Sequence, residues 1–526
     1  MSEVRRFFVT GTGAPASDLS GLGDREELRI TSASVVDRTF LDTADGRLDR
    51  ADVVLELRRP VEGGGPATLV CVDDGRVVST QTLAAAEAPR FVDDLPAGAS
   101  VDLLAGLMEM RALVPGPTVR CRVTMLAALD AEEKTTARVQ VEEAALLDGT
   151  ELPVLVELHQ LRGYDREADR LQKLLVSRLE LEPCTVSMAR FARSAAGVPG
   201  FVPTKLRLML GPSSAADAWR VVLRALTDTM AANFAGTVAD TDSEFLHDFR
   251  VAVRRTRSVL KEGAHVLPPE SREHFRDGFK WLGDITTPQR DADVHLLDFP
   301  DLVASLPPER AEALEPLRAL LVERQRSCHQ QLVTDLRSLR RARLGQEWAA
   351  FLAGEGAWPA DDGGEPGSDA PEALDPAIVV VAKRIRKAHR RLVQDGRAID
   401  DASPATALHD LRKDAKRLRY LLECFGSLFP VGDVATAVKP LKSLQDTLGT
   451  FQDTEVQIHA LEGFGEQLIE RGAGAPTLLA MGAVIENVGA RGVGARKEFA
   501  TRFATFDSAA VRAAYKRLSL DAEAAS

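Results

Sequence analysis

Two segments of the chain decide its fold: residues 247–257 read HDFRVAVRRTR, and residues 409–419 read HDLRKDAKRLR. The second segment begins 162 residues after the first. The same offset, without a gap, matches Pro268 to Pro430 and later residues as far as Val294. Chance explains this poorly, whereas two copies of one unit explain it simply. Apolar residues recur every three or four positions in both segments, which predicts a duplicated helical domain.

Each predicted helix carries a row of cations beside its apolar face. At about 100° per residue these side chains share an arc of roughly 80°. Cations three or four residues apart destabilise a helix by a few tenths of a kcal/mol per pair, so a helix selected only for folding would mix acids into this face. The rows therefore indicate a groove that gathers anions, and the planar fork of arginine suits phosphate oxygens. The rows consist of His247, Arg250, Arg254, Arg257 and Lys261 in the first copy and His409, Arg412, Lys416 and Arg419 in the second.

An internal network of ion pairs is an alternative explanation of the rows, and spacing alone favours neither explanation. The histidines could equally be satisfied core residues, although their recurrence in both copies argues against this. Arg255 and Arg417 point away from the rows, so their role is open. The acids that could neutralise the rows are Asp284, Asp291, Asp293, Asp446, Asp453 and Glu455.

Two other kinds of site are less consistent with the motif. A metal-dependent phosphohydrolase would need adjacent His and Asp ligands, but neighbours on a helix diverge by about 100°, which turns Asp248 and Asp410 away from the rows. Nearby arginines would also repel a divalent cation. A nucleic-acid groove binder is disfavoured because the rows adjoin the apolar seam and aromatic residues are only 5% of the chain.

The composition is that of a folded globular protein: of 526 residues, 45% are hydrophobic and 27% are charged. Lys and Arg number 66 against 78 Asp and Glu, a net charge of −12, which argues against a general nucleic-acid-coating protein. The first 200 residues hold 23 basic and 32 acidic residues, and the remainder hold 43 and 46. A basic cluster in the nearly neutral second part is therefore a local arrangement.

Other features point to a cytoplasmic protein without a membrane partner. The uncharged apolar run at residues 377–382 is far too short to span a bilayer. Residues 1–10 lack the apolar stretch of a signal peptide. Five scattered cysteines without a CxxC motif indicate neither a disulfide framework nor a structural zinc site.

Three breaks divide the chain, the weakest of them around Gly472–Pro476. Gly- and Pro-containing residues 195–214 predict an interdomain connection, and the acidic residues 354–376 predict a flexible linker. Alternating patterns before the first break predict strands, for example at 118–124 and 137–143. Helical periodicity dominates after it. The predicted helices span residues 216–234, 243–264, 269–281, 308–343, 378–393 and 406–425. The predicted domains are residues 1–200, 213–350 and 377–526, with residues 351–376 as the linker.

The helical part resembles a CHAD domain, the conserved-histidine α-helical domain, over about residues 213 to 510. The resemblance implies two pseudo-symmetric helical bundles whose basic residues line a central groove and bind inorganic polyphosphate. Whether the two repeats form one site or two stays open. The matching motifs are His247–Arg257, PQRDADV at Pro288–Val294, HDLRKDAKRLRYL at His409–Leu421 and LQDTLGTFQDTEV at Leu444–Val456. The candidate polyphosphate-binding residues are the members of both rows together with Arg255, Lys280, Arg290, Arg417 and Lys442.

Residues 1–200 resemble a CYTH domain, in which a closed antiparallel barrel binds triphosphates with a divalent metal. The family's opening ExExK motif falls here on Ser2, Val4 and Arg6, so its acid pair is missing. The matching stretches are FLDTADGRLDRADVVLELRR at Phe40–Arg59, VRCR at Val119–Arg122 and VELHQLRG at Val156–Gly163. The departures elsewhere are Glu56 in place of an expected arginine, a strand over Ala67–Val72 without its lysine, and His159 in place of a late glutamate. The candidate tunnel residues are Arg6, Arg58, Arg120, Arg122 and Glu157.

The main hypothesis is a cytoplasmic polyphosphate-binding protein, including association with polyphosphate granules, whose barrel is a degenerate appendage without catalytic residues or cofactor. The alternative is an inorganic triphosphatase that uses Mg²⁺ or Mn²⁺ and receives substrate from the helical domain. A third option is a protein-interaction scaffold. The sequence leaves the oligomeric state open.

Overall fold

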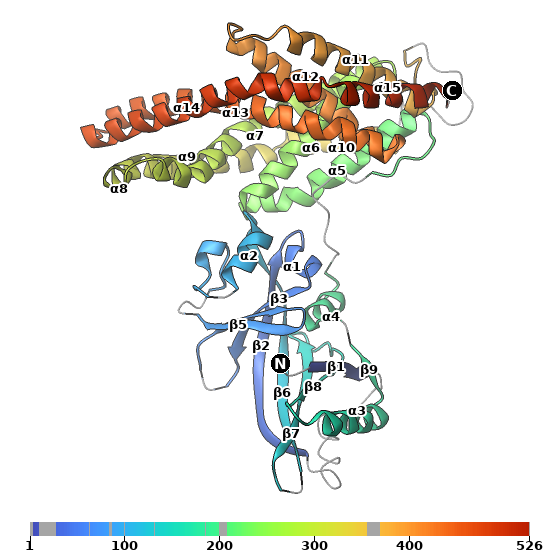
Figure 1. The fold of residues 1–526 in the computed structure, drawn as a ribbon, viewed down its shortest axis with the longest axis vertical. Coiled ribbons are helices and arrows are strands. Elements are labelled where there is room, and N and C mark those ends of the chain that lie inside the picture. Colours follow the sequence, from blue (N-terminus) through green and yellow to red (C-terminus); the bar gives the residue numbers. More distant parts are fainter. Residues whose placement is uncertain are drawn as a thin grey trace. The chain divides into compact units, whose positions relative to one another are not determined.

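The computed structural model describes residues 4–9, 28–62, 64–83, 87–98, 100–130, 132–184, 186–198, 208–354 and 369–524. The chain divides into two compact units, Met1–Val202 and Pro203–Ser526 (Figure 1). The boundary lies within the stretch 195–214, of which residues 199–207 are outside the described part. An antiparallel sheet domain followed by a helical domain was predicted from the sequence, and this order is confirmed.

The described strands of the first unit form a single antiparallel sheet in the order β5-β4-β3-β2-β6-β7-β8-β1-β9. The strands are β1 (Val4–Val9), β2 (Leu28–Thr43), β3 (Val53–Pro60), β4 (Thr68–Asp73), β5 (Arg76–Thr82), β6 (Leu113–Leu129), β7 (Thr135–Leu146), β8 (Leu155–Gln160) and β9 (Leu181–Pro183). The helices are α1 (Arg47–Arg50), α2 (Val101–Met108), α3 (Asp165–Leu179) and α4 (Met188–Ala195), with a 3-10 turn at Val92–Asp94.

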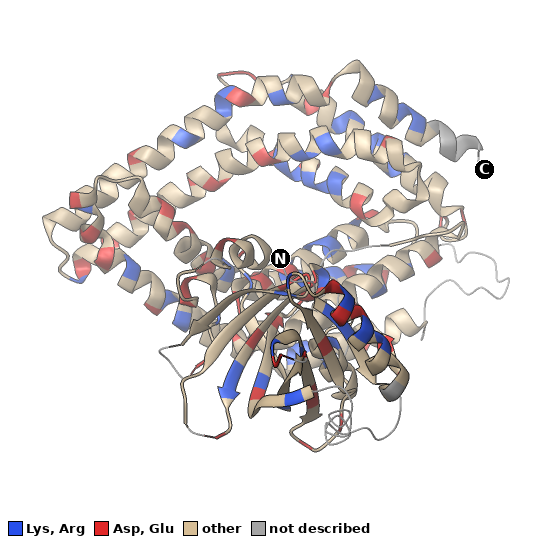
Figure 2. Ribbon diagram, turned by 60° about the horizontal axis from the view of Figure 1, so that its bottom comes forward, with Lys and Arg blue, Asp and Glu red and all other residues tan. Residues whose placement is uncertain are grey.

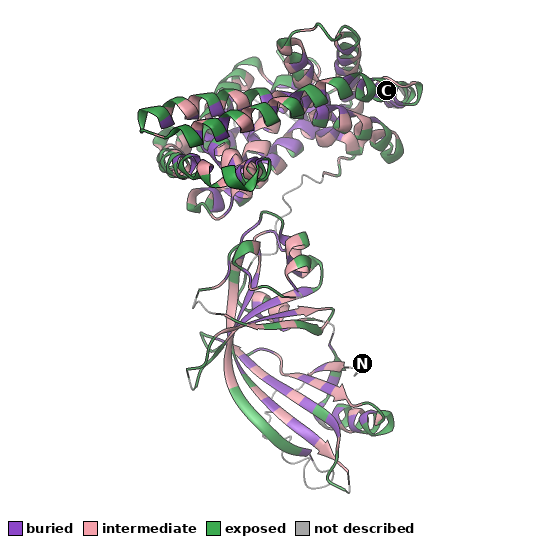
Figure 3. Cartoon of the chain, turned by 60° about the vertical axis from the view of Figure 1, so that its left-hand side comes forward, coloured by how far each residue is buried: buried purple, intermediate pink, exposed green. Residues whose placement is uncertain are grey.

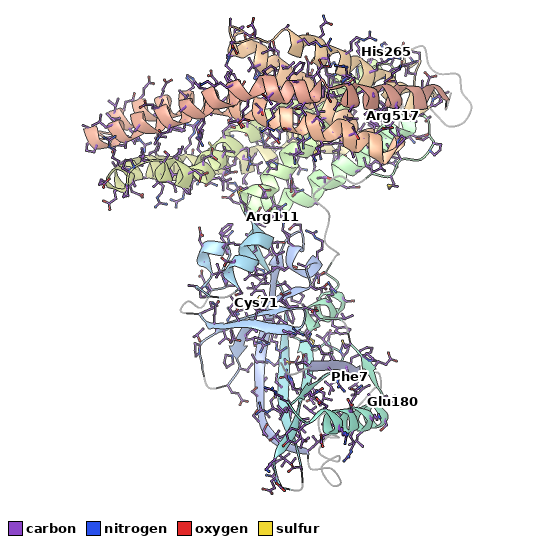
Figure 4. The ribbon with its side chains drawn as sticks, viewed as in Figure 1. Phe7, Cys71, Arg111, Glu180, His265 and Arg517 are labelled. Atoms are coloured by element: carbon purple, nitrogen blue, oxygen red, sulfur yellow. The ribbon has the colours of Figure 1, made fainter. Side chains whose placement is uncertain are left out.

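Both faces of the sheet are partly covered by helices. On one face Phe40 and Val119 pack against Met188 of α4. On the other, α1 and α2 cover a cluster that contains Cys71, and α3 covers a cluster that contains Phe7 (Figure 4). Figure 3 shows these buried positions running along the strands.

The sheet curls on itself although β5 and β9, the ends of the strand order, do not pair. Arg6 of β1 donates from Nη2 to the carbonyl of Gly75, in the turn between β4 and β5, at 2.5 Å. β1 stands beside one end of the strand order and this turn belongs to the other end. A side chain therefore joins the two ends where the described backbone ladder is open.

The second unit is helical throughout its described elements. Its helices are α5 (Ala215–Ala239), α6 (Ser243–Glu262), α7 (Pro269–Ala304), α8 (Pro308–Ala311), α9 (Glu315–Leu336), α10 (Leu339–Ala353), α11 (Ala377–Arg397), α12 (Ala405–Phe425), α13 (Val431–Glu470), α14 (Ala475–Phe506) and α15 (Ala509–Ala524), with 3-10 turns at Glu312–Leu314 and Gly426–Leu428. None of the helices in the described ranges has the length and apolar character that crossing a membrane requires.

The helix starts follow the offset between the two motifs. Helices α5, α6 and α7 begin at residues 215, 243 and 269, and α11, α12 and α13 begin 162 residues later in each case. Two expectations were wrong. The helix predicted over 308–343 is divided into α8, α9 and α10. The helix predicted over 269–281 continues to Ala304 as α7, through Pro288 and Pro300. A proline inside a helix costs about 3 kcal/mol. Burial of Leu282 and Phe299 on the same helix offsets this cost.

A shared core joins the two halves of the helical unit. The ring of Trp219 in α5 lies 4.4 Å from the ring of Phe425 in α12, measured between centroids. The indole nitrogen of Trp219 donates to the carbonyl of Val259 in α6 at 3.0 Å. Figure 3 shows buried residues in the interior of the helical unit. The two halves therefore fold as one unit rather than as separate bundles.

Two ion pairs bridge α6 and α12. Arg255 of α6 donates to Glu423 of α12 at 2.6 Å. Arg417 of α12 donates to Glu262 of α6 at 2.5 and 3.0 Å. Since Arg255 and Arg417 are related by the offset of 162, the interface is close to self-complementary, as in a two-fold symmetric dimer.

The acidic stretch expected to be a linker is structured on both sides of the undescribed residues 355–368. Residues 351–353 complete α10, and Ala370 and Ala373 are buried. The amide of Ala215 donates to the carbonyl of Asp375 at 2.8 Å. The prediction of a flexible linker was therefore wrong for residues 369–376, because they hydrogen-bond with the start of α5.

We expect Glu262→Gln to lower the free energy of unfolding of the helical unit by about 1–3 kcal/mol, because Arg417 loses the carboxylate that its buried guanidinium requires. All four tryptophans follow residue 202, so tryptophan fluorescence during urea unfolding reports this unit. Glu486→Gln removes an exposed acid of α14 and is the matched control. Equal stability of the two variants would show that the bridge between α6 and α12 contributes nothing.

Candidate anion-binding cavity

A cavity of about 850 Å³ lies among α6, α7, α9, α12, α13 and α14. Both halves of the helical unit contribute to it, since α6 and α12 are the helices that carry the two motifs. Figure 2 shows Lys and Arg positions on helices that border the opening of this unit. The two cation rows therefore meet at one cavity.

The lining of the cavity carries more positive than negative charge. Its described residues include seven arginine and lysine side chains and four aspartates, a formal excess of three positive charges. The cations are Arg250, Arg254, Arg290, Arg324, Arg412, Lys416 and Arg491, and the aspartates are Asp291, Asp298, Asp301 and Asp453.

The N-terminal cap of α6 fixes where the helix begins, and its buried face fixes the direction of its row of cations. Asp242 caps the helix by accepting hydrogen bonds from the amides of Glu244 and Phe245 at 3.0 and 3.2 Å. The apolar side of α6, including Phe249 and Val253, is buried in the core of the unit. At 100° per residue this orientation leaves Arg250 and Arg254 beside the seam, at the cavity.

Arg250 is held by neutral acceptors. Its Nη1 donates to the carbonyl of Gly283 at 3.1 Å and to the hydroxyls of Thr286 and Thr287 at 2.7 and 3.0 Å. Burial, followed by the nearby charge of Arg254, lowers the pKa of Arg250 to about 10. The guanidinium is therefore fixed in place while most of its charge remains uncompensated.

Arg254 and Lys416 are the least compensated cations of the cavity. Within the described part of the chain, neither side chain has a hydrogen bond or an ion pair, and Nε of Arg254 is buried without a partner. Burial, followed by the charges of Arg412 and Arg254, lowers the pKa of Lys416 to about 8. Because Arg254 belongs to α6 and Lys416 to α12, the repulsion acts between the two copies of the motif.

The carboxylates of the cavity compensate this charge only in part. Arg412 pairs with Asp453 at 3.0 Å, but the Asp453 side chain is 71% exposed, where an ion pair contributes little. Burial raises the pKa of Asp291. Arg290 donates to the backbone carbonyl of Ser243 at 3.3 Å rather than to an acid. The alternative of a complete salt-bridge network thus does not describe these residues.

Two cations of the cavity were missed by the sequence analysis. Arg324 of α9 lies over the ring of Phe464, 5.6 Å from its centroid, and Arg491 of α14 donates to Gln457 at 3.2 Å. Both residues lie outside the recurring motif, so the repeat did not single them out. Only the packing of α9 and α14 against α7 and α13 brings them to the cavity.

The structure brings together some predicted residues and separates others. Those that line the cavity are His247, Arg250, Arg254, Arg290, Arg412 and Lys416. Lys261, Lys280 and Lys442 are exposed and lie outside it, as does Arg257, which is close to Gly283.

The remaining predicted cations have other partners. His409 Nδ1 lies 2.5 Å from the Gln452 side-chain oxygen, and Arg419 donates to Glu423 at 2.6 Å. Arg255 and Arg417 form the ion pairs between α6 and α12. These four residues are not among the described lining of the cavity, so the structure places them apart from the cavity cations.

In the first unit, the sheet register separates the predicted tunnel residues. Asp37 lies opposite Arg120, and Arg38 lies opposite Val119. Successive strand residues alternate between faces, so Arg120 and Arg122 lie on the face opposite to Arg38. Arg120 donates to Asp37 at 2.9 and 3.0 Å with its side chain 55% exposed. Grouping these two arginines with Arg6, Arg58 and Glu157 was therefore wrong.

The face that carries Arg38 holds a self-neutralised network. Arg38, only 3% exposed, donates to both carboxylate oxygens of Glu142 at 2.9 and 2.6 Å. Glu56 accepts from Arg58 at 2.7 Å and lies 3.9 Å from Arg38. These buried charges are compensated within the protein.

Glu157 lies on the same face of the sheet and has cationic partners of its own. Arg6 donates to Glu157 at 2.7 Å, and His159 lies 3.4 Å from it. Burial alone would raise the pKa of Glu157, but these two partners lower it below its usual range. Each buried carboxylate thus already contacts a cation, and Ser2 lies outside the described residues. In the described ranges no cluster of three or more His, Cys, Asp or Glu could hold a metal, so these residues do not fit the divalent ion that the CYTH resemblance implies.

Comparison with protein families matches residues 221–462 to the CHAD domain. Among solved structures, the chain is similar to the CHAD domain from the plant Ricinus communis, with 25% identity, coverage of 60% of this chain and 97% of that chain, and a TM-score of 0.44. No curated protein was found that matches the chain. The CHAD domain predicted from the motifs is thereby confirmed.

Two other solved structures are similar to part of the chain. The putative adenylyl cyclase HpAC1 from Hippeastrum, described as having a dominant triphosphatase activity, is 14% identical, with coverage of 39% of this chain and 98% of that chain and a TM-score of 0.29. A putative adenylate cyclase from Bacillus halodurans is 16% identical, with coverage of 36% and 97% and a TM-score of 0.28. The CYTH resemblance of the first unit rests on its motifs and its antiparallel sheet.

We expect Lys416→Met to raise the free energy of unfolding at pH 7 by about 1 kcal/mol in the absence of ligand, because it removes a partly buried charge that Arg412 and Arg254 repel. Lys413→Met on the same helix is the control, since Lys413 is exposed and pairs with Asp410 at 3.0 Å. Urea unfolding followed by tryptophan fluorescence measures both. A loss of stability in Lys416→Met would contradict the view that this charge is unfavourable in the free protein.

Proposed function

Since residues 221–462 form a CHAD domain, we propose that this protein binds inorganic polyphosphate in the cavity shared by α6 and α12. The observation that supports the proposal is the convergence of cations from both motifs without matching carboxylates. Arg254 and Lys416 repel each other across the cavity in the free protein. A polyanion bound between the two side chains would attract both of them and offset their mutual repulsion, which is a specific reason to expect a ligand.

The chemistry of the lining suits phosphate. Arginine presents a fixed fork of donors that matches two phosphate oxygens, and such charge-assisted hydrogen bonds are about twice as strong as neutral ones. Cations contributed by α6, α7, α9, α12 and α14 surround the cavity, so a chain with a charge on every unit would meet donors from several sides. Preorganisation by Gly283, Thr286 and Thr287 reduces the entropy that Arg250 would lose on binding.

In this proposal the first unit performs no metal-dependent hydrolysis. Its buried carboxylates Glu56, Glu142 and Glu157 are each paired with arginine. A divalent ion would have to displace these arginines and leave buried cations unpaired, which costs several kcal/mol. Release of phosphate from tripolyphosphate by the full-length protein with Mg²⁺ or Mn²⁺ would overturn this part of the proposal and favour the triphosphatase hypothesis.

The double variant Arg254→Glu with Lys416→Glu should weaken binding of long-chain polyphosphate by roughly 100-fold or more, because two attractive contacts become repulsive. Neither residue has a structural partner in the described chain, so helix content should not change. Titration calorimetry and circular dichroism measure the two effects.

A charge-matched control tests whether the position of the charge matters. Lys280→Glu with Lys442→Glu changes the net charge equally at two exposed sites that lie outside the cavity. We expect this control to keep most of the affinity for polyphosphate and the same dependence of affinity on salt. In the cavity variant the logarithm of the binding constant should decrease less steeply with the logarithm of salt concentration, because fewer cations contact the ligand. Equal losses in both variants would indicate nonspecific attraction and contradict binding in the cavity.

Binding should also weaken as the pH rises above about 8, the pKa of Lys416 in the free protein. Above this pH the complex must take up a proton at Lys416, so affinity should fall by up to about tenfold per pH unit until the pKa of the bound lysine is reached. Lys416→Arg should be nearly independent of pH between 7 and about 9, since arginine stays charged there. A pH-independent wild-type affinity over the same range would place Lys416 outside the binding site.

A further inference from the structure

A second pocket, of about 650 Å³, lies between α11 and α15 and shares no lining residue with the cavity. Among the described residues of its lining there is no Asp or Glu, and five side chains are cations. These cations are Arg386, Arg390, Arg397, Arg512 and Lys516. Neither α11 nor α15 contributes to the cavity among α6, α7, α9, α12, α13 and α14.

The cations of this pocket form two rows. Arg386, Arg390 and Arg397 follow one side of α11, and Arg512 and Lys516 lie one turn apart on α15. Like charges at this spacing disfavour a helix by a few tenths of a kcal/mol per pair. The rows therefore carry a cost that the fold alone does not explain.

A carboxylate near the pocket, that of Asp507, compensates part of this charge. Asp507 accepts from Arg397 at 2.8 and 3.1 Å and from Arg512 at 3.0 Å. Within the described residues, Arg390 and Lys516 have neither a hydrogen bond nor an ion pair. Two exposed cations on facing helices are thus available to an external anion.

The floor of the pocket is rigid and uncharged. The ring of His389 stacks on Tyr515 with 3.9 Å between centroids, and Tyr515 is 3% exposed. Burial lowers the pKa of His389 to about 4, so its imidazole is neutral at pH 7, and its buried Nε2 has no hydrogen-bond partner. A ligand in this pocket would therefore contact the flat, uncharged surface of these two rings, with the cations surrounding it.

The first half of the unit shows that this pocket is not a requirement of the fold. At the offset of 162, Thr227 of α5 corresponds to His389 of α11. Trp348 of α10 fills the corresponding space and donates to the hydroxyl of Thr227 at 2.8 Å. In the first half Trp348 therefore packs at the position where the second half has a pocket.

Two of the three α11 cations are also absent from the first half. Asp228 and Ala235 stand at the positions that correspond to Arg390 and Arg397. Arg224, which corresponds to Arg386, donates to the carbonyl of Leu352 at 2.7 Å. The helix that corresponds to α11 thus packs with one of these three cations, which supports a role other than packing for the cations of α11.

We propose that the pocket between α11 and α15 is a second anion site that takes a short chain of phosphates, such as tripolyphosphate or the triphosphate group of a nucleotide. Arg390 and Lys516 have no bonded partner among the described residues, and Arg397 and Arg512 share Asp507. This arrangement favours a multivalent anion, and guanidinium groups favour phosphate geometry. The volume of the pocket lies in the range of small-ligand sites. The proposal does not depend on polyphosphate binding in the cavity.

The test measures tripolyphosphate binding to the full-length protein by titration calorimetry in a background that carries Arg254→Glu and Lys416→Glu. Adding Arg390→Glu and Lys516→Glu should lower the remaining affinity by roughly tenfold or more, because two charge-assisted contacts are lost. The matched control adds Lys387→Glu and Lys497→Glu, which change the same net charge at exposed residues outside both sites. This control should bind as the background does.

A second arm uses ATP in place of tripolyphosphate. Equal sensitivity to Arg390→Glu with Lys516→Glu would show that the pocket recognises the phosphate chain whatever is attached to it, and loss confined to ATP would assign the site to nucleotides. Unchanged binding of both probes in the pocket variant would overturn the proposal. That result would leave the cavity proposal intact, because the cavity is tested by long-chain polyphosphate in the otherwise unmodified protein.

Discussion

The packing of α6 against α12 is the constraint on which the rest of the helical unit depends. Trp219 on Phe425 joins the two halves in one core, and the Arg255–Glu423 and Arg417–Glu262 pairs set the position of one helix along the other. Because these contacts are close to two-fold symmetric, the remaining cations of both helices turn toward the same space. One cavity, rather than two sites, follows from this geometry.

The cost of this arrangement is electrostatic. Lowered pKa values for Arg250 and Lys416 mean that the folded protein disfavours these charges relative to water, and burial contributes most to both shifts. The shared core offsets the cost, since the buried face of each helix lies beside the face that carries the cations. A helix that buries Phe249 while it holds Arg250 beside the cavity is a compromise of the kind expected where function competes with stability.

The sequence could predict the helical duplication, the cation rows and the identity of six cavity residues, because the periodicity of a helix and a gapless offset are local properties. It could not predict that Arg254 lines the cavity and Arg257 does not, because both residues lie within one arc of about 80°. The packing of the neighbouring helices decides which of them reaches the cavity. It also could not find Arg324 and Arg491, which reach the cavity through helices without a motif. In the sheet, Arg120 and Arg122 were grouped with the wrong face because register, not motif, decides which side a strand residue takes.

The two units use similar residues in opposite ways, and this contrast is informative about ligands. In the sheet, Arg38 and Arg58 meet Glu142 and Glu56, so the buried charges cancel within the protein. In the helical unit, Lys416 meets other cations. Both arrangements place charge in partly buried positions, which is expensive unless a partner is supplied. Where the protein supplies the partner, the charge serves the fold; where it does not, the uncompensated charge favours a negatively charged partner from solution, as we propose for the cavity.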